Sequence, residues 1–194
     1  MRNAGFEETC RLEDFDWSSA TTRDRRLLYS VFSLKFLSKH EHVLLVGPAG
    51  VGTTFLAQAL VLSVIRAGYT GRFLHADGFF QAMTQAWVDN SLDQTSISFL
   101  FPNLLILNDL GLHRLTAQQS ADLYELIIRR HRPSSFVITG KRAVEEWLSF
   151  LGDPTLGNSA LDHLSNAKFK IVIEGGQLEG RTVSPPQAAG QRGR

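Results

Sequence analysis

The fold of this chain is decided by one stretch of sequence, Gly47-Pro48-Ala49-Gly50-Val51-Gly52-Thr53-Thr54. It follows a short apolar run at residues 43–46 (VLLV) and precedes an apolar segment with helical spacing at residues 55–65. The stretch fits the phosphate-binding pattern G-x-x-x-x-G-K-[ST] at every position except the lysine, where Thr53 stands. Its glycines allow the backbone to turn N–H groups inward, and the start of the following helix adds a partial positive charge. We therefore predict an anion-binding turn between a buried strand and a helix.

Thr53 changes what this turn can hold. In the pattern, the lysine reaches the outer phosphates of a nucleotide, a distance that the short hydroxyl of threonine does not span. Loss of one charge-assisted hydrogen bond weakens binding by about 1.5–3 kcal/mol. Thr54 keeps the hydroxyl that the pattern places next to a metal ion. The alternative is a glycine-rich turn that binds no ligand, but the apolar strand before it and the apolar helix after it favour a phosphate loop.

The composition is that of a globular protein without a strong charge. The chain has 194 residues, of which 43% are hydrophobic and 20% charged, and a formal net charge of +1, which suits one α/β domain. Any contact with DNA has to rest on local patches, because this net charge gives no overall field. The single cysteine, Cys10, excludes an intramolecular disulfide and a thiolate metal cluster. No apolar run is long enough to cross a bilayer and no signal-type apolar core is present, so we expect a cytoplasmic protein without a membrane partner.

Apolar segments along the chain predict strands and helices in turn. Strands are expected at residues 43–46, 72–75, 104–107, 135–139 and 168–173, and helices at residues 23–39, 55–65, 78–88, 117–130, 144–150 and 159–164. Asp77 and Thr116 are expected to cap the helices that they precede. The segment at residues 12–17 (LEDFDW) is expected to lie on the domain as an extended clip with its aromatic side chains facing inward. From residue 175 onward the chain is rich in Gly, Pro, Gln and Arg, and we expect it to be disordered.

This alternation predicts a three-layer αβα fold with a five-stranded parallel sheet and right-handed crossovers. Ligands of such sheets bind at the carboxyl ends of the strands. The loop at residues 47–54, the pair Asn108-Asp109 and residues 139–142 each follow or end a predicted strand. We therefore expect these three segments to form a single candidate site.

Several segments resemble one family. They are the clip at residues 12–17, the strand and loop at residues 43–52, and residues 65–69, 104–111, 145–147, 152–154 and 161–164. Together they make the chain similar to the IstB-like and DnaC-like branch of the AAA+ ATPases, which assist insertion-sequence transposition or load replicative helicases. The resemblance covers residues 12–174 and is closest to the IstB side. It implies a P-loop NTPase fold of the AAA+ type, with a clip at residues 1–25, an ATP-binding domain at residues 26–174 and a tail at residues 175–194.

The resemblance also implies a ligand, a metal and roles for individual residues. ATP would bind at residues 47–54, with Mg²⁺ next to Thr54 and Asn108, and Asp109 would orient the attacking water. The family has an aspartate where this chain has Asn108, which brings no negative charge to a divalent ion.

Two further positions depart from the family. Its polar sensor falls at or beside Gly140-Lys141, and the arginine that completes the site of a neighbouring subunit is expected after Asp162, where this chain has His163. Phosphoryl transfer depends almost wholly on positioning and charge neutralisation. The changes at residues 53, 108, 141 and 163 therefore predict weak or absent ATP hydrolysis. Lys141 could in principle return a cation to the γ-phosphate.

The family pattern and the altered residues support different functions. One hypothesis is an ATP-binding helper of insertion-sequence transposition, with DNA and a transposase as partners and a homo-oligomer as its assembled form. The other is a non-hydrolysing pseudo-ATPase that serves as a binding module or is a transposon remnant. A DnaC-like helicase loader in DNA replication is a third possibility, which differs from the helper in its partner.

Other groups of residues carry weaker signals. The six histidines show no metal-ligand spacing on one helix, and no G-x-S-x-G elbow marks a nucleophile. Basic groups at residues 23–26, 129–132 and 141–142, and the tail arginines at residues 181, 192 and 194, would contact DNA phosphates if the family role applies. The alternative for each is a solvated helix end, where cations complement the helix dipole.

Overall fold

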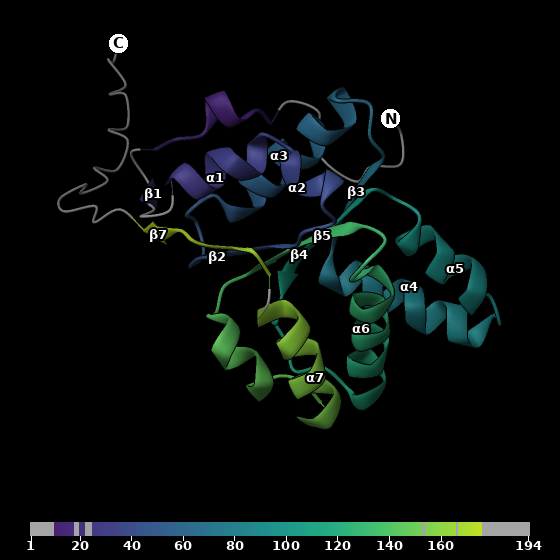
Figure 1. Cartoon of the computed structure of the whole chain (residues 1–194). Helices are drawn as coiled ribbons and strands as arrows, with labels where there is room; N and C mark the ends of the chain where they lie inside the picture. Colours follow the sequence, from purple (N-terminus) through teal and green to yellow (C-terminus); the bar gives the residue numbers. More distant parts are fainter. Residues whose placement is uncertain (1–9, 18–19, 22–24, 153, 166, 176–194) are drawn as a thin grey trace, which may run out of the picture.

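The structure, a computed structural model, describes residues 10–17, 20–21, 25–152, 154–165 and 167–175. Its centre is a sheet of five parallel strands in the order β3-β4-β5-β2-β6 (Figure 1). The strands are β2 (Val43–Val46), β3 (Gly71–His75), β4 (Leu104–Leu110), β5 (Ser135–Gly140) and β6 (Phe169–Val172). The predicted five-stranded parallel sheet is confirmed.

Two layers of helices cover this sheet (Figure 1). One contains the short 3-10 helix η1 (Leu12–Asp14), α1 (Arg25–Phe32), α2 (Lys35–Ser38) and α3 (Thr53–Arg66). The other contains α4 (Ala76–Val88), α5 (Leu92–Leu100), α6 (Ala117–Arg130), the 3-10 helix η2 (Val144–Ser149) and α7 (Pro154–Ser165). The predicted three-layer architecture is therefore present. None of the described helices combines the length and the apolarity that crossing a bilayer requires.

The central strands are apolar throughout because helices lie on both faces of the sheet. Every residue of β2 and β5 is buried, as is typical of a parallel strand between two helical layers. Side chains of β2 alternate between the two cores, with Leu44 and Val46 in the core under α4, α6 and α7 and Val43 and Leu45 in the core under α1 and α3. The apolar strand thus joins the two cores and holds the loop that follows it.

The helix predicted at residues 23–39 is in fact two helices, and residues 23–24 lie outside the described part. Leu34 has a left-handed backbone with a φ of 60°, which ends the α-helical ladder. The Ser33 hydroxyl donates to the Ser30 carbonyl (2.6 Å), a local bond that competes with helical hydrogen bonds. After this break, Phe36 and Leu37 of α2 are buried in the core.

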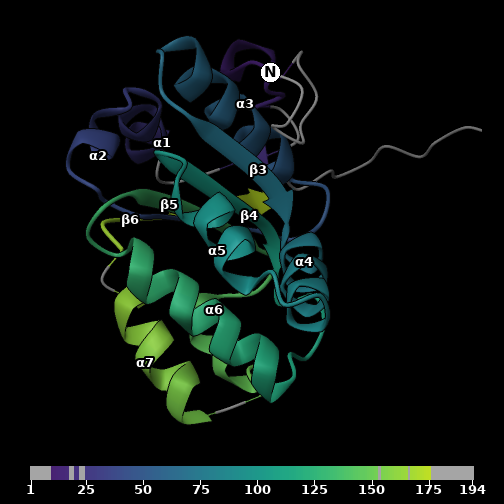
Figure 2. The ribbon, with the colours of Figure 1, turned by 90° about the vertical axis from the view of Figure 1, so that its right-hand side faces the viewer.

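The sequence pattern does not predict α5, because the segment LDQTSISFL is mostly polar. A side chain from another helix helps to define this one. Arg130 of α6 is fully buried and donates to the carbonyl oxygens of Phe99 (2.7 Å) and Leu100 (3.1 Å), acceptors that a helix end leaves open. α5 packs on α4 and on α6, and Figure 2, which looks at the molecule from the side, shows these three helices next to one another.

The two predicted helix caps have different outcomes. Thr116 caps α6, because its Oγ1 accepts a hydrogen bond from the Gln119 amide (3.2 Å) and the Gln119 side chain accepts one from the Thr116 amide (2.9 Å). The prediction for Asp77 is wrong. The first residue of α4 is Ala76, so Asp77 lies in the first turn and His75 occupies the N-cap position without a side-chain cap.

Other boundaries differ from those predicted. β4 continues to Leu110, three residues beyond the predicted end at residue 107. The segment near residues 144–150 is a 3-10 helix, and α7 begins at Pro154, before the predicted residue 159.

A second, two-stranded sheet joins segments from opposite ends of the chain. β1 (Ala20–Thr21) pairs antiparallel with β7 (Glu174–Gly175). Gly175 of the expected tail is therefore in a strand, and residues 176–194 lie outside the described part. In the clip, Phe15 is buried, with its ring centroid 4.7 Å from Trp17 and 6.0 Å from Phe55 of α3.

Candidate functional site

The glycine-rich loop connects the end of β2 to the start of α3. Gly50 and Gly52 have φ angles of 86° and 88°, which only glycine adopts at low cost. The Gly47 amide donates to the Gly140 carbonyl at the end of β5 (3.1 Å). A Cβ at Gly47 would lie 2.5 Å from the carbonyl oxygen of Ile173, after β6. The loop thus begins in a tight space between the two strands that flank β2.

The two halves of the loop differ in exposure. Pro48, Ala49 and Gly50 are exposed, and the predicted binding residues Val51 and Thr53 are buried, with exposed fractions of 4% and 8%. Thr53 is the first residue of α3 and packs inward, and Thr54 is half-buried. The exposed half is therefore the part that a ligand can reach directly.

The start of α3 adds an electrostatic contribution. α3 is 14 residues long and has no acidic residue in its first turn, so the partial positive charge of its N-terminus is not offset locally. Phe15 of the clip packs closely against Gly52 at this helix start, since a Cβ on residue 52 would lie only 2.5 Å from Phe15 Cε2. The local structure suits an anion bound by main-chain amides.

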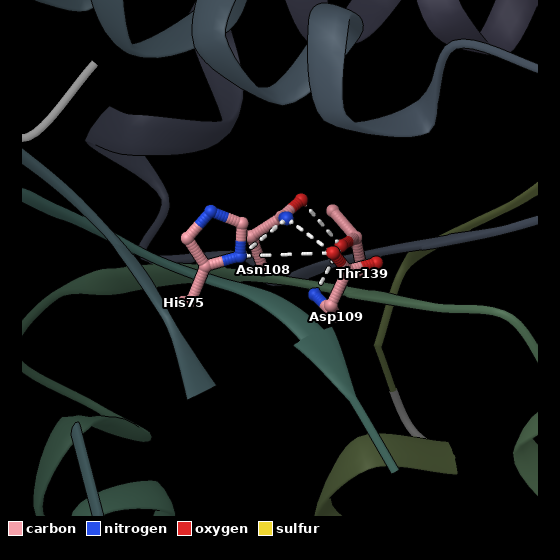
Figure 3. A network of polar contacts seen from close by, with 4 residues as sticks. All are labelled: His75, Asn108, Asp109 and Thr139. Atoms are coloured by element: carbon pink, nitrogen blue, oxygen red, sulfur yellow. Dashed lines mark hydrogen bonds and ion pairs between the residues drawn. The ribbon is translucent and has the colours of Figure 1, made fainter. Parts of the chain in front are cut away.

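The second predicted segment, Asn108-Asp109, belongs to a network of four polar side chains (Figure 3). The Thr139 hydroxyl of β5 donates to Asn108 Oδ1 (2.8 Å) and accepts from the Asp109 amide (2.8 Å). Asn108 Nδ2 in turn donates to Asp109 Oδ2 (3.0 Å) and to His75 Nδ1 (3.2 Å). Since every donor faces an acceptor, the amide of Asn108 links the hydroxyl to the carboxylate.

Asn108 and Asp109 differ in access to solvent. Asn108 is fully buried, whereas the side chain of Asp109 is 19% exposed. Asp109 has a left-handed backbone with a φ of 61°, at an irregularity in the pairing of β4 with β5 between Leu107 and Leu110. Asp and Asn tolerate this conformation better than most residues do. The irregularity leaves the Asp109 carboxylate at the edge of the sheet, next to His75.

His75 was not among the predicted site residues. It ends β3 and is paired with Asn108 in the parallel register. Its Nδ1 lies 3.6 Å from Asp109 Oδ2, and its side chain is 58% exposed. The sequence feature that points to His75 is its position at the end of a predicted strand, because polar residues at the ends of neighbouring parallel strands lie at the same edge of the sheet.

The third predicted segment follows β5 and lies directly beside the loop. Val46 pairs with Gly140 in the register of β2 and β5. The fully buried Trp147 holds the next residues, because its Nε1–H donates to the Arg142 carbonyl (3.0 Å). Lys141 and Arg142 are exposed. The structure thus brings the three predicted segments to the carboxyl edge of β4, β5 and β2.

His163 lies elsewhere. Its ring packs edge-on against His131, which follows α6, with a centroid distance of 4.7 Å. His131 in turn lies beside His42, which precedes β2, at 5.5 Å. These rings are at the amino end of β2, the end away from residues 47–54. Burial lowers the pKa of His42 to about 4, and the neighbouring His131 contributes to this.

One predicted basic group is partly excluded from contact with DNA. Arg130 is fully buried, and desolvation lowers the pKa of its guanidinium to about 10, so the group stays charged at neutral pH. The neighbouring Arg129 is exposed and lies 3.8 Å from Glu125 on the same helix. Arg132 is exposed. Arg130 therefore has a structural role.

Comparison with known proteins identifies the family. The profile described as "IstB-like ATP binding protein" matches residues 1–184. An ATP-binding protein of an insertion sequence of Mycobacterium tuberculosis is 33% identical over an alignment of 190 positions, which covers 95% of this chain and 76% of that protein. The ATP-binding protein of insertion sequence IS21 from Pseudomonas aeruginosa is 28% identical over 164 residues, which are 84% of this chain and 62% of that protein.

Solved structures with the same fold come from replication proteins. The DnaC helicase loader has a TM-score of 0.66 and 20% identity, over 79% of this chain and 92% of that one. The replication initiator DnaA, bound to AMPPCP and single-stranded DNA, has a TM-score of 0.70 and 15% identity, over 87% of this chain and 51% of that one. At these identities the similarity shows the fold alone, a P-loop fold of the AAA+ type. Sequence and fold agree, and the chain belongs to the family of IstB-like ATP-binding proteins.

Proposed function

We propose that this chain is an ATP-binding helper of insertion-sequence transposition whose own ATP hydrolysis is weak or absent. Family membership supports the ligand and the biological setting. The observation that carries the proposal is the loop conformation, with left-handed Gly50 and Gly52 immediately before a long helix at the carboxyl edge of the sheet. Main-chain N–H groups and the helix start bind phosphates in such a loop.

Weak hydrolysis follows from the polar network. A residue that orients attacking water needs a free carboxylate close to the phosphates. Asp109 keeps an oxygen available, since only its Oδ2 accepts from Asn108, but the neighbouring Asn108 carries no negative charge and its oxygen already accepts from Thr139. Thr53, at the lysine position, is buried and brings no cation. The site is therefore suited to binding a nucleotide, but it has few charged groups to stabilise the charge that develops during hydrolysis.

The donor set does not fit a magnesium ion held by the protein. Magnesium prefers carboxylate and water oxygens in regular octahedral geometry. Asn108 is neutral, fully buried and bound through its oxygen to Thr139, so it is a poor ligand for an incoming ion. Thr54 is left as the predicted metal-facing residue on the loop. We therefore assign no step of the function to a protein-bound metal.

Nucleotide titration tests the proposal directly. Isothermal titration of the full chain with ATP should give a dissociation constant in the micromolar range, and a coupled assay should detect little or no phosphate release. Gly50→Ala is the matched variant, because its Cβ would meet no atom within 4 Å while the left-handed backbone becomes unfavourable. Weaker ATP binding by this variant is expected. Steady phosphate release by the unaltered chain would overturn the non-hydrolysing assignment, and the absence of ATP binding would overturn the whole proposal.

Restoring the family residues provides a second test. In Thr53→Lys/Asn108→Asp, titrated with ATP and Mg²⁺, the lysine can reach the outer phosphates, and a bound divalent ion offsets the repulsion between the new carboxylate and Asp109. Nucleotide affinity should rise first, before any hydrolysis is measurable. Far-UV circular dichroism checks that the variant folds. A folded double variant with unchanged affinity would contradict our assignment of residues 53 and 108.

DNA is the partner that we propose, contacted through exposed arginines. Arg26 of α1 and Arg132 are both exposed. Fluorescence anisotropy with duplex DNA should show an affinity that falls steeply between about 50 and about 200 mM salt. Arg26→Gln and Arg132→Gln should each reduce that salt dependence, whereas the ion-paired Arg129→Gln should change it less. Unchanged DNA binding in both exposed variants would remove these residues from the proposal.

A further inference from the structure

The phosphate loop has no cation of its own. Thr53 replaces the lysine of the pattern and is 8% exposed at the start of α3. Main-chain amides and a helix start contribute only partial charges. The outermost phosphate of a nucleoside triphosphate lies farthest from these amides and carries the most charge to be neutralised. A triphosphate therefore needs a cation from another element.

Lys141 is placed next to the loop by two strands. β5 and β2 are neighbours in the sheet, and the Gly47 amide donates to the Gly140 carbonyl (3.1 Å). Lys141 thus follows the residue that is hydrogen-bonded to the first glycine of the loop. Thr139, two residues before it on β5, belongs to the network with Asn108 and Asp109, and β5 lies between β4 and β2, so Lys141 follows a strand that joins this network to the loop.

The backbone around Lys141 is anchored although its side chain is exposed. Trp147 is 1% exposed and packs on Gly140, where a Cβ would lie 3.1 Å from Trp147 Cζ2. The Nε1–H of the same tryptophan donates to the Arg142 carbonyl (3.0 Å). Residues on both sides of Lys141 are therefore held by one buried ring. The ammonium group starts from a fixed point at the edge of the sheet, which lowers the entropy lost when it binds.

We propose that Lys141 supplies the cation that the loop lacks and binds the outermost phosphate of a nucleoside triphosphate. This inference rests on the proposed nucleotide binding at residues 47–54. It adds a specificity that the loop by itself lacks, because a diphosphate leaves Lys141 without its partner. The site then distinguishes ATP from ADP through the side chain of Lys141, the residue that follows β5, although it hydrolyses ATP weakly or not at all.

The test compares ATP and ADP in the same full-length chain. Isothermal titrations of wild type and Lys141→Met should show ATP affinity lowered by about 10-fold to 100-fold, the effect of one charge-assisted contact. The ADP affinity of Lys141→Met should stay within about twofold of the wild-type value, because the main-chain amides that bind the phosphates common to ATP and ADP are unchanged. Lys141→Arg should recover part of the ATP affinity because it keeps the charge. The lysine is exposed, so the substitution does not disturb the core.

Two further variants separate a specific contact from a general field. Lys39→Met removes the same charge from an exposed residue before β2, at the opposite edge of the sheet, and should leave ATP affinity unchanged. Arg142→Met removes a charge next to Lys141. If it lowers ATP affinity as much as Lys141→Met does, the contact is not specific and the inference is overturned. Thr53→Lys in the Lys141→Met background should restore discrimination between ATP and ADP.

The outcomes distinguish this inference from the function on which it rests. If wild type binds ATP and Lys141→Met binds ATP and ADP as wild type does, the assignment of Lys141 falls and nucleotide binding stands. If Lys141→Met loses ATP and ADP affinity equally, Lys141 contributes the same free energy to the binding of both nucleotides, and the proposed triphosphate specificity is wrong. If wild type binds neither nucleotide, both proposals fall together.

Discussion

Asn108→Asp should destabilise the protein in a strongly pH-dependent way. Asn108 Nδ2 donates to Asp109 Oδ2 at 3.0 Å in a fully buried position. The substitution replaces this donor by a second carboxylate. Two like charges 3 Å apart repel by about 5 kcal/mol at an effective dielectric constant of about 20. The protein can avoid that repulsion by keeping one carboxyl protonated.

Protonation sets the expected magnitude. Keeping a carboxyl of ordinary pKa, about 4, protonated at pH 7 costs about 4 kcal/mol, or about 1.4 kcal/mol per pH unit. This is less than the repulsion, so the variant should lose about 3–4 kcal/mol of unfolding free energy at pH 7 and about 1 kcal/mol at pH 5. The sign follows from a raised folded-state pKa in the variant, which makes the loss grow as pH rises above about 4.

Urea unfolding followed by far-UV circular dichroism, repeated from pH 5 to pH 8, measures this difference. The matched control is the exchanged pair Asn108→Asp/Asp109→Asn, which again has one amide and one carboxylate. It should recover most of the lost stability at pH 7, because Asn also tolerates the left-handed backbone at residue 109, where φ is 61°. A loss below about 1 kcal/mol at pH 7, or a loss that does not change with pH, would refute the hydrogen-bond assignment in the network.

Three further predictions concern the folded framework. Burial and His131 lower the pKa of His42 to about 4, so the unfolded chain takes up a proton before the folded chain does, and the unfolding free energy should fall by up to about 3 kcal/mol as pH drops from about 6.5 to about 4. His42→Phe should flatten this slope in urea titrations, and an unchanged slope would place the titrating group elsewhere. Arg130→Met should lower the free energy of unfolding by about 3–5 kcal/mol, because it leaves buried carbonyls without donors. Arg129→Met, which changes the exposed neighbouring residue, should lower it by at most about 0.5 kcal/mol. Equal losses in the two variants would contradict the structural role of Arg130. Gly52→Ala should destabilise more than Gly50→Ala, because only residue 52 would also collide with Phe15, and equal melting temperatures would show that Phe15 does not pack there.

Local sequence was sufficient where one signal dominated its neighbourhood. The apolar runs of β2 and β5 are too short for helices and are bounded by polar or glycine-rich turns, so their strands were predictable. Thr116 and Gln119 form a capping box within four residues, so the start of α6 was predictable too. In each case the interacting groups are close in sequence.

Other features depended on partners that are distant in sequence. α5 has a mostly polar sequence, and its final carbonyls are bound by Arg130, about thirty residues away. His75 joins the candidate site only because β3 and β4 pair in a register that places it beside Asn108. The break at Leu34 allows α2 to bury Phe36. A single-sequence pattern contains no signal for these contacts.

The amino-acid sequence by itself determined the layered parallel fold, the position of the glycine-rich loop and the residues that depart from the family pattern, because periodicity and residue type are local properties. Only the tertiary structure decided which side chains face one another at the edge of the sheet. It directs the Asn108 amide to Asp109, buries Thr53 and bonds Gly140, the residue before Lys141, to Gly47. These relations arise from strand order and register, since parallel strands bring together residues that are far apart along the chain.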